Sequence, residues 1–394
     1  MNNVEIAKGV YFVGAVDWNV RDFHGYITPR GATYNAYLIV DEKICLIDTV
    51  KKPFAGEMIE RIANIIDPAK IDYIVTNHIE PDHAGALPDI LKCAPNAKVV
   101  ITDKGREGAI KYFDCESADF QVVKEGDVLD LGRNKLHFVP LPMLHWPDSM
   151  ATYLDTEEIL FSNDAFGQHF SSTHRFDDEN DIEEVMYEAA KYYANILLPF
   201  GRLVPKALQK AGQLPIKLIA PSHGVVWRTH IAKIIEKYCD WSAGKAQNKV
   251  VIAYDSMWGA TEKMARRILD GVASVGVQGK LYRLSVADRS EVMWDIMESK
   301  GVMIGSSTLN NTVMPTVGAM LFYMKGLRPA GKIGAAFGAC GWAGGSQTAI
   351  EEFLCAAGIE LDKSGLTLKW TPDDKEMEKC FEYGQEFGRR ILER

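Results

Sequence analysis

Several features are missing from the 394-residue sequence, and each absence excludes a class of protein. No apolar run, Val317–Met324 included, approaches the roughly 20 residues that a bilayer-spanning helix requires. The first ten residues carry Glu5 and Lys8 and lack an apolar segment, so we expect no signal peptide. Basic residues do not outnumber acidic ones (44 Lys and Arg against 53 Asp and Glu), so the basic field typical of nucleic-acid binders is absent. We therefore expect a cytoplasmic protein that binds neither a membrane nor nucleic acid.

Cysteine is present, but never as a C-x-x-C pair. The seven cysteines are Cys45, Cys93, Cys115, Cys239, Cys340, Cys355 and Cys380. This scatter is typical of buried thiols in a reducing compartment, and it excludes a disulfide framework and a zinc or rubredoxin-type cysteine site. Any metal must therefore be held by histidines and carboxylates. A hydrophobic content of 47% excludes a disordered chain.

The first part of the chain contains strand-like runs in series, with helical patterns after several of them. The runs predicted as strands are Val10–Val16, Tyr37–Val40, Lys43–Asp48, Ile71–Thr76, Lys98–Thr102, Phe120–Val123, Lys135–Pro140, Met150–Leu154, Ile159–Ser162 and Lys217–Ala220. The helical patterns are Phe54–Ile66, Ala84–Cys93, Gly105–Phe113 and Asp181–Leu197. This order predicts a two-sheet sandwich flanked by helices, which we assign to residues 1–247.

The composition changes at Trp241–Asn248, a small and polar stretch that we interpret as a linker. Beyond it, strands and helices alternate strictly. The predicted strands are Val250–Tyr254, Lys280–Leu284, Gly301–Gly305 and Lys332–Phe337. The predicted helices are Glu262–Val272, Arg289–Ser299, Thr316–Met324, Ser346–Ala357 and a last one from Pro372. Strict alternation predicts a parallel, doubly wound sheet over residues 248–394.

Four potential metal ligands follow one predicted strand within six residues: His78, Glu80, Asp82 and His83. Alternate side chains of an extended segment point the same way, so the first three can converge, while His83 opens the next helix. Four ionisable groups this close together are poorly suited to a hydrophobic core. The loop is therefore predicted to bind metal, and two metals could share it.

Three further candidate ligands also lie at strand ends. They are His145, Asp164 and His223. A single histidine at a strand end is more often structural, so these residues gain weight only together with the first loop.

Three loops in the second part of the chain predict a phosphate-bearing ligand. Residues 256–261 form a turn rich in hydroxyl groups and glycine between a strand and a helix, where backbone N–H groups can bind an anion. The loops at residues 306–311 and 338–345 also follow strands of the parallel sheet, at the edge where such folds bind ligands. Trp258 and Trp342 lie on these loops and can enclose a flat ring.

The first loop is similar to that of the metallo-β-lactamase superfold, whose hydrolases carry His-x-His-x-Asp-His there. Glu80 stands where the hydrolases have histidine, and a carboxylate favours iron over zinc. Together with His145, Asp164 and His223, the pattern resembles the flavodiiron proteins (A-type flavoproteins). The resemblance covers the whole chain, and it implies a metallo-β-lactamase-like αββα sandwich followed by a flavodoxin-like doubly wound parallel sheet.

The resemblance also implies a role for individual residues. One iron would be held by His78, Glu80, His145 and Asp164. The other would be held by Asp82, His83, Asp164 and His223, so that Asp164 bridges the two ions. FMN would be bound by Ser256, Met257, Trp258, Gly259, Ala260, Thr261, Ser307, Thr308, Leu309, Asn310, Asn311, Gly338, Ala339, Cys340, Gly341, Trp342, Ala343 and Gly344. Groups that orient bound oxygen or supply protons would be His24, His169 and Tyr193, although Tyr192 adjoins the last.

The function that the resemblance implies is reduction of O2 to water, of NO to N2O, or of both. Electrons would pass from an external donor, such as rubredoxin or a reduced deazaflavin, through FMN to the diiron centre. With no C-x-x-C pair, we expect no fused rubredoxin. Two alternatives stay open: a zinc hydrolase of the metallo-β-lactamase type, and an FMN electron carrier with a structural metal domain.

The assembly that we expect is a head-to-tail homodimer, or a tetramer of such chains. Treated as uniform spheres, the two domains have centres about 40 Å apart. Electron transfer over that span within one chain would be slow. A head-to-tail dimer, which the family also implies, would place each flavin against the partner's metals.

Overall fold

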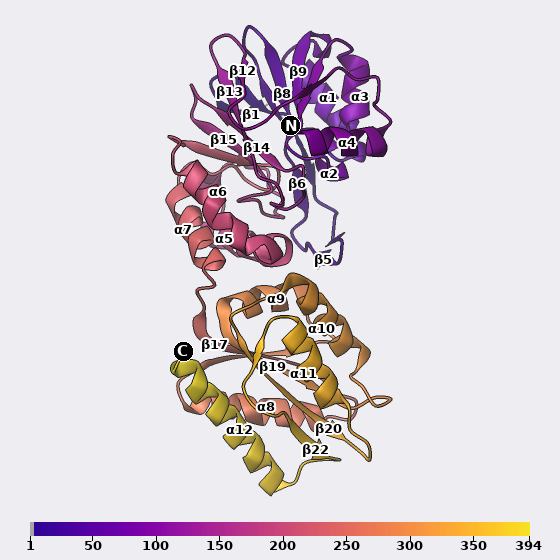
Figure 1. Ribbon diagram of the computed structural model, residues 1–394, viewed down its shortest axis with the longest axis vertical. Coiled ribbons are helices and arrows are strands. Elements are labelled where there is room, and N and C mark those ends of the chain that lie inside the picture. Colours follow the sequence, from indigo (N-terminus) through magenta and orange to yellow (C-terminus); the bar gives the residue numbers. More distant parts are fainter. Residues whose placement is uncertain (1–3) are drawn as a thin grey trace. The chain divides into compact units, whose positions relative to one another are not determined.

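The computed structural model describes residues 4–394, which divide into two compact units (Figure 1). Unit 1 runs up to Tyr193 and resumes over Arg202–Cys239. Unit 2 contains Asp240–Arg394 and the short segment Ala194–Gly201, whose membership in unit 2 the sequence did not indicate. Within the described residues, no helix is long and apolar enough to cross a membrane.

Unit 1 is a sandwich of two sheets. The larger sheet has the order β1 (Val4–Ala7), β2 (Val10–Phe12), β7 (Tyr37–Ile39), β8 (Ile44–Ile47), β9 (Ile71–Val75), β10 (Lys98–Ile101) and β11 (Phe120–Val122). The smaller has the order β12 (Val128–Asp130), β13 (Lys135–Pro140), β14 (Met150–Leu154), β15 (Ile159–Asn163) and β16 (Leu218–Pro221). Two short hairpins pair β3 (Ala15–Asp17) with β6 (Ala32–Tyr34), and β4 (Asp22–Phe23) with β5 (Tyr26–Ile27).

Helices cover both outer faces of this sandwich, which confirms the predicted architecture. On one side, Figure 1 shows α1 (Ala55–Ala63), α2 (Pro81–Ala84), α3 (Leu87–Cys93) and α4 (Asp103–Phe113). On another side it shows α5 (Ile182–Tyr192), α6 (Val204–Ala211) and α7 (Ile231–Ser242).

The core of unit 1 follows from the two-residue repeat of its strands. In β8, Cys45 and Ile47 point into the core between the two sheets, whereas Leu46 points to the core beneath the helices. Central strands that are buried on both faces are apolar at every position, which explains why the sequence shows continuous hydrophobic runs there. The charged residues that follow these strands therefore stand out in the sequence.

Unit 2 is a doubly wound parallel sheet, as predicted. Its order is β18 (Gln278–Arg283), β17 (Gln247–Asp255), β19 (Ser299–Ser306), β20 (Ile333–Cys340) and β21 (Glu360–Leu361), and β22 (Leu366–Lys369) also pairs with β20. One face packs against α9 (Arg289–Glu298), α10 (Pro315–Leu327) and α11 (Ser346–Ala356). The other packs against α8 (Ala260–Ser274) and α12 (Asp374–Leu392), as Figure 1 shows.

Some predicted elements have different limits. The run Val10–Val16 is not one strand, because the chain leaves the large sheet after β2; a Cβ on Gly14 would lie 2.3 Å from the carbonyl oxygen of Tyr34. The pattern Asp181–Leu197 is not one helix either: α5 ends at Tyr192, and a π-helical turn follows. The predicted linker Trp241–Asn248 is shorter in the structure, since α7 reaches Ser242 and β17 begins at Gln247.

Candidate metal centre and ligand pocket

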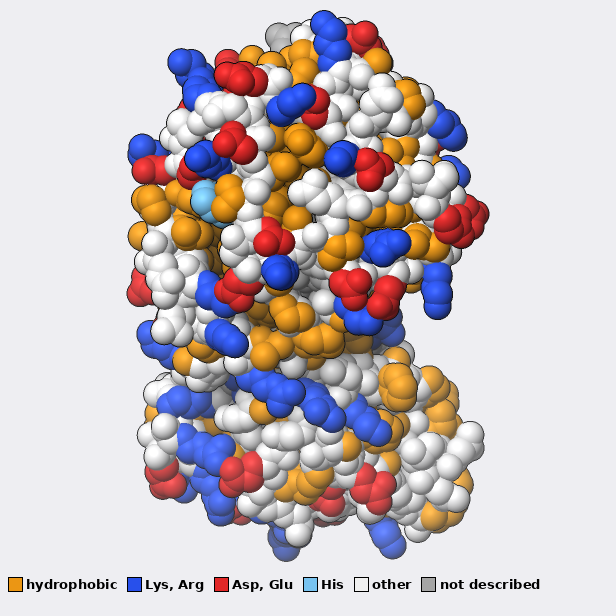
Figure 2. Space-filling view, turned by 45° about the horizontal axis from the view of Figure 1, so that its top comes forward, with side chains coloured by type: hydrophobic (Ala, Val, Ile, Leu, Met, Phe, Trp, Pro, Cys, Tyr) orange, Lys and Arg blue, Asp and Glu red, His pale blue; other side chains and the backbone are white. Residues whose placement is uncertain are grey.

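Four strand ends of unit 1 carry the seven predicted metal ligands. The segment after β9 supplies His78 and Glu80, and Glu80 immediately precedes α2, which carries Asp82 and His83. The loop after β13 supplies His145, and Asp164 and His223 follow β15 and β16. All seven residues are buried except His145, whose side chain is 15% exposed. The face drawn in Figure 2 accordingly shows little histidine surface.

The first group of candidate ligands consists of Glu80 and the two histidines beside its carboxylate, His78 and His145. His78 Nε2 lies 3.2 Å and His145 Nε2 lies 3.3 Å from Glu80 Oε2. Nitrogen and oxygen atoms of these residues lie close enough together to bind a single metal ion.

A second group is formed by Asp82, His83 and His223. His223 Nε2 lies 3.3 Å from Asp82 Oδ2, and His83 Nε2 lies 3.6 Å from Asp82 Oδ1. The two imidazole nitrogens are 3.3 Å apart. His83 is thus directed into the cluster.

Asp164 lies between the two groups and presents one oxygen to each. Its Oδ2 is 3.4 Å from His145 Nε2 and 4.0 Å from His78 Nε2. Its Oδ1 is 3.3 Å from His83 Nε2 and 3.5 Å from His223 Nε2. A carboxylate in this position is suited to bridge two metal ions.

The charges in this cluster call for cations. Three buried carboxylates lie together, and neither oxygen of Asp82 has a well-aligned hydrogen bond among the described residues. Burial disfavours a charged imidazole, yet the hydrogen bonds that His145 donates to Asp164 and Glu80 raise its pKa to about 9. Burial also disfavours a charged His223, but its hydrogen bonds to Asp164 and Asp82 outweigh burial and raise its pKa to about 10. The three carboxylates therefore attract positive charge to this cluster, and a donor set of four imidazoles and three carboxylates fits two divalent ions of intermediate hardness.

Neighbouring groups fix the direction of two histidine rings. His78 Nδ1 is 2.9 Å from Asp148 Oδ2, and His223 Nδ1 donates to the carbonyl oxygen of Thr33 at 2.7 Å. Such contacts set the tautomer and direct Nε2 towards the metal position. The sequence analysis did not single out Asp148, although it lies three residues after His145.

The three residues predicted beside the centre differ in their placement. His24 Nε2 lies 3.4 Å from Glu80 Oε1, on a side chain that is 78% exposed. His169 is buried, with its ring 5.3 Å from that of His223. Tyr192, the neighbour of Tyr193, contacts the cluster through Asp164.

The two neighbouring tyrosines differ in the contacts that they make in unit 1. The hydroxyl of Tyr192 donates to Asp164 Oδ1 at 2.8 Å. The ring of Tyr193 packs instead against Tyr238, with a centroid distance of 5.1 Å. The resemblance named Tyr193, with Tyr192 beside it, and in the structure these two residues lie where α5 ends and the π-helical turn begins.

Unit 2 contains a cavity of about 610 Å³ at the carboxyl ends of its strands. This volume suits a ligand with a tricyclic ring. The predicted residues that line it are Met257, Trp258, Ala260, Ser307, Thr308, Leu309, Asn310, Asn311, Ala339, Cys340, Gly341, Trp342 and Ala343. Trp258 and Trp342 are 94% and 84% exposed, so both rings are available to cover a flat ligand.

Five predicted residues do not line this cavity but support its walls: Ser256, Gly259, Thr261, Gly338 and Gly344. Gly259 has a φ of 86° and directly precedes α8, so that the helix N-terminus faces the turn. The hydroxyl of Thr261 lies 3.0 Å from that of Ser307, which also accepts the backbone N–H of Met257. These groups lie at the turn for which the sequence predicts anion binding.

Trp370 and Thr371 also line the cavity, and the sequence analysis missed both. The ring of Trp370 lies 6.1 Å from that of Trp342. A Cβ on Gly341 would meet this ring at 3.1 Å, so the glycine lets the two loops approach each other. The sequence did offer one signal for this position. Trp370 directly follows Leu366–Lys369, a short segment that forms a parallel strand.

Known proteins resemble this chain over both units. Residues 32–224 match the family described as ODP family beta lactamase, and residues 252–384 match the flavodoxin family. A nitric oxide reductase of Moorella thermoacetica is 48% identical, over 99% of this chain and 99% of that protein.

Solved structures give the same picture. The flavodiiron protein from Giardia intestinalis superposes with a TM-score of 0.98 at 40% identity, covering 100% of this chain and 97% of that one. The rubredoxin oxygen:oxidoreductase of Desulfovibrio gigas does so with a TM-score of 0.97 at 39% identity, covering 100% of this chain and 99% of that one. With this likeness over its full length, the chain belongs to the flavodiiron protein family.

Proposed function

We propose that the chain reduces O2 to water, NO to N2O, or both, with electrons from an external donor. The observation that carries this proposal is the pair of ligand groups that share Asp164, with Glu80 in the first group. Membership of the family makes the chain an oxidoreductase, since relatives are named nitric oxide reductase and rubredoxin oxygen:oxidoreductase.

The metal centre would hold two iron ions. His78, Glu80 and His145 would bind one ion together with Asp164 Oδ2. Asp82, His83 and His223 would bind the other together with Asp164 Oδ1. The ions, when bound, would supply electrons and open coordination positions for a diatomic gas.

Protein groups around the centre would orient its ligands. The hydroxyl of Tyr192 holds Asp164 from the side of α5. His24 and His169 lie beside Glu80 and His223, where they could donate hydrogen bonds to a gas-derived oxygen.

The cavity of unit 2 would hold FMN. Ser256, Thr261 and Ser307 would bind its phosphate at the N-terminus of α8, and Trp258 and Trp342 would enclose its ring. FMN, when bound, would carry two electrons each time the donor reduces it. The donor would be rubredoxin or a reduced deazaflavin, and the assembly would be a head-to-tail dimer or a tetramer in the cytoplasm.

Gas consumption tests this function directly. Protein loaded with ferrous iron and FMN, then reduced without air, should consume O2 or NO over many turnovers while a donor is supplied. Two zinc ions per chain and no flavin in the purified protein would instead indicate a hydrolase. A flavin that is reoxidised without catalytic gas consumption would indicate an electron carrier.

Glu80→His should shift the centre towards zinc and abolish gas reduction, because an imidazole replaces a charged oxygen ligand. Iron affinity should fall at least about tenfold, because even the mutation of a group that only hydrogen-bonds to a metal ligand costs about this much. Metal content after loading with equal iron and zinc measures the change. Glu60→His, on the exposed side of α1, is the control. Full iron and full activity in the Glu80 variant would rule out this ligand.

Removing two hydroxyls at the turn should weaken FMN and leave iron unchanged. The double variant Ser256→Ala, Thr261→Val loses two donors to a charged phosphate, each worth about 1.5 kcal/mol, so the dissociation constant should rise about 100-fold. Fluorescence titration of flavin-free protein measures it. Ser274→Ala, at the far end of α8, serves as the control. An unchanged affinity would mean that the phosphate binds elsewhere.

Mixed dimers test whether electrons cross between chains. One chain carries His78→Ala and Asp164→Ala, and the other carries Ser256→Ala, Thr261→Val and Trp258→Ala. Each homodimer should be inactive. The mixed dimer should regain one working flavin–diiron pair. Because the wild-type dimer would have two equivalent pairs, the mixed dimer should show about half of the wild-type activity. Inactive mixed dimers, prepared alongside active wild-type dimers exchanged in the same way, would show that transfer runs within one chain.

A further inference from the structure

A row of ionisable side chains runs along one face of α5 towards the metal cluster. Glu184, Glu188 and Tyr192 are spaced four residues apart and therefore share a face of the helix. The side chain of Glu184 is 38% exposed, whereas that of Glu188 is fully buried and Tyr192 is 2% exposed. The row thus leads from solvent into the interior over two turns, about 12 Å of helix.

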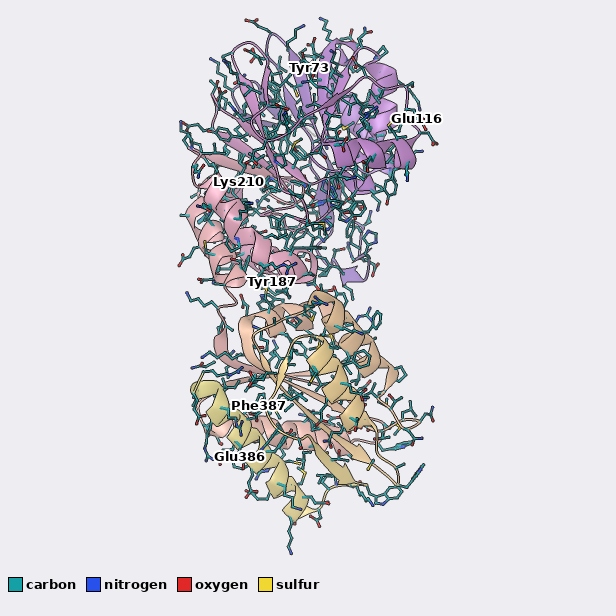
Figure 3. All side chains as sticks on the ribbon, in the orientation of Figure 1. Tyr73, Glu116, Tyr187, Lys210, Glu386 and Phe387 are labelled. Atoms are coloured by element: carbon teal, nitrogen blue, oxygen red, sulfur yellow. The ribbon has the colours of Figure 1, made fainter. Side chains whose placement is uncertain are left out.

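The outer end of this row is held by Arg30. Its guanidinium pairs with Glu184 and, through Nη1, with Glu188 Oε1 at 2.7 Å. It also lies 5.4 Å from the ring centre of Tyr187, which Figure 3 labels on α5. A half-exposed arginine therefore joins a carboxylate that contacts water to one that does not.

The inner end of the row reaches the cluster. Tyr192 follows Glu188 by one turn, and its hydroxyl donates to Asp164 Oδ1 at 2.8 Å. Lys191, also buried, places its Nζ 5.5 Å from the ring centre of Tyr26.

From Tyr26, stacked rings continue to the second ligand group. The Tyr26 ring lies 4.8 Å from that of His169, and His169 lies 5.3 Å from His223. Ring contacts thus extend from Lys191, the residue before Tyr192, to the second ligand group.

Burial of the Glu188 carboxylate costs folding free energy, and packing alone does not explain why a carboxylate stands at this position. A buried ion pair is often no more stabilising than apolar residues of the same volume. Arg30 already has Glu184 as a partner, and Glu188 Oε2 has no hydrogen bond among the described residues. Burial raises the pKa of Glu188, and the nearby charges of Lys191 and Arg30 oppose that rise. Its place inside the protein, paired with the half-exposed Arg30 and one helical turn from Tyr192, suits a group that passes protons from solvent.

We propose that Glu188 is the proton carrier that supplies the metal centre from solvent, an inference that rests on the proposed function. Reduction of O2 takes four electrons and four protons to give two H2O. Reduction of two NO takes two electrons and two protons to give N2O and H2O. Glu188 gives its proton inward across the last turn of α5, to oxygen atoms of the substrate, and regains one from solvent beside Glu184 and Arg30. Glu188 is not one of the proposed metal ligands, so its role is distinct from theirs.

Infrared spectroscopy tests the first half of this proposal without any gas. Difference spectra of the loaded protein between acidic and alkaline buffers should show the carbonyl band of a protonated, buried carboxylic acid. The band should shift in D2O, disappear in Glu188→Gln and persist in Glu183→Gln, an exposed residue of the same helix. If Glu188→Gln leaves this region of the spectrum unchanged, the proposal is wrong.

Single-turnover kinetics test the second half. After reduction and mixing with O2 or NO, Glu188→Gln should be reoxidised about 100-fold more slowly than wild type, the lower end of the range for loss of a positioned proton donor. The solvent deuterium isotope effect should rise, and Glu188→Asp should recover much of the rate. Iron content, FMN content and the rate of flavin reduction by the donor should match those of Glu183→Gln.

The outcomes separate this proposal from the proposed function. Equal reoxidation rates and isotope effects in wild type and Glu188→Gln would overturn the proton carrier and leave gas reduction standing. A slower rate that comes only with lost iron, and that Glu188→Asp does not restore, would also overturn it, because that pattern is structural. If the wild type consumes neither gas, the function itself fails, and a missing infrared band would overturn the carrier separately.

Discussion

The position of Asp164 is the constraint on which the site of unit 1 depends. A carboxylate at 1% exposure is strongly disfavoured without positive charge nearby. Here each of its two oxygens faces a separate set of histidines, so the same residue ties both ligand groups together. Metal ions meet that need for charge better than protons do, because they bind Glu80 and Asp82 as well.

The architecture explains how seven ligands from distant parts of the chain come together. The large sheet contributes its ligands after β9, and the small sheet contributes those after β13, β15 and β16. These strands pack apolar side chains into the core between the two sheets, so the rigid core ends where the ligands begin. Side chains placed by such a scaffold need little further support, and Asp148 and Thr33 supply it for two of the rings.

Much of the fold was predictable because central strands and amphipathic helices leave strong periodic patterns. The predicted ends of helices and strands were wrong where a close approach between backbone segments, and not the side-chain pattern, determines where an element ends. Gly14 is an example: its contact with the chain at Tyr34 divides one apolar run between two sheets. At the candidate site, the clustered ligands were legible in sequence, but Tyr192 was not, because one residue at the end of α5 decides which ring faces Asp164. Trp370 was missed for a similar reason, since its place beside Trp342 depends on a short strand with little pattern of its own.

The two units bind their ligands by different physical means. In unit 1 the site is buried and charged, so the cations compensate charges that folding has already enclosed. In unit 2 the site consists of loops outside the sheet, with tryptophans 258 and 342 almost fully exposed. A flat ring gains affinity there by covering aromatic surface, which water otherwise contacts at a cost. The hydrophobic cores of unit 2 lie on the two faces of its sheet and are held by its helices. Loss of the metals, by contrast, leaves Asp82, Asp164 and Glu80 enclosed together, and the stability of unit 1 is therefore coupled to metal binding far more closely than that of unit 2 is to flavin.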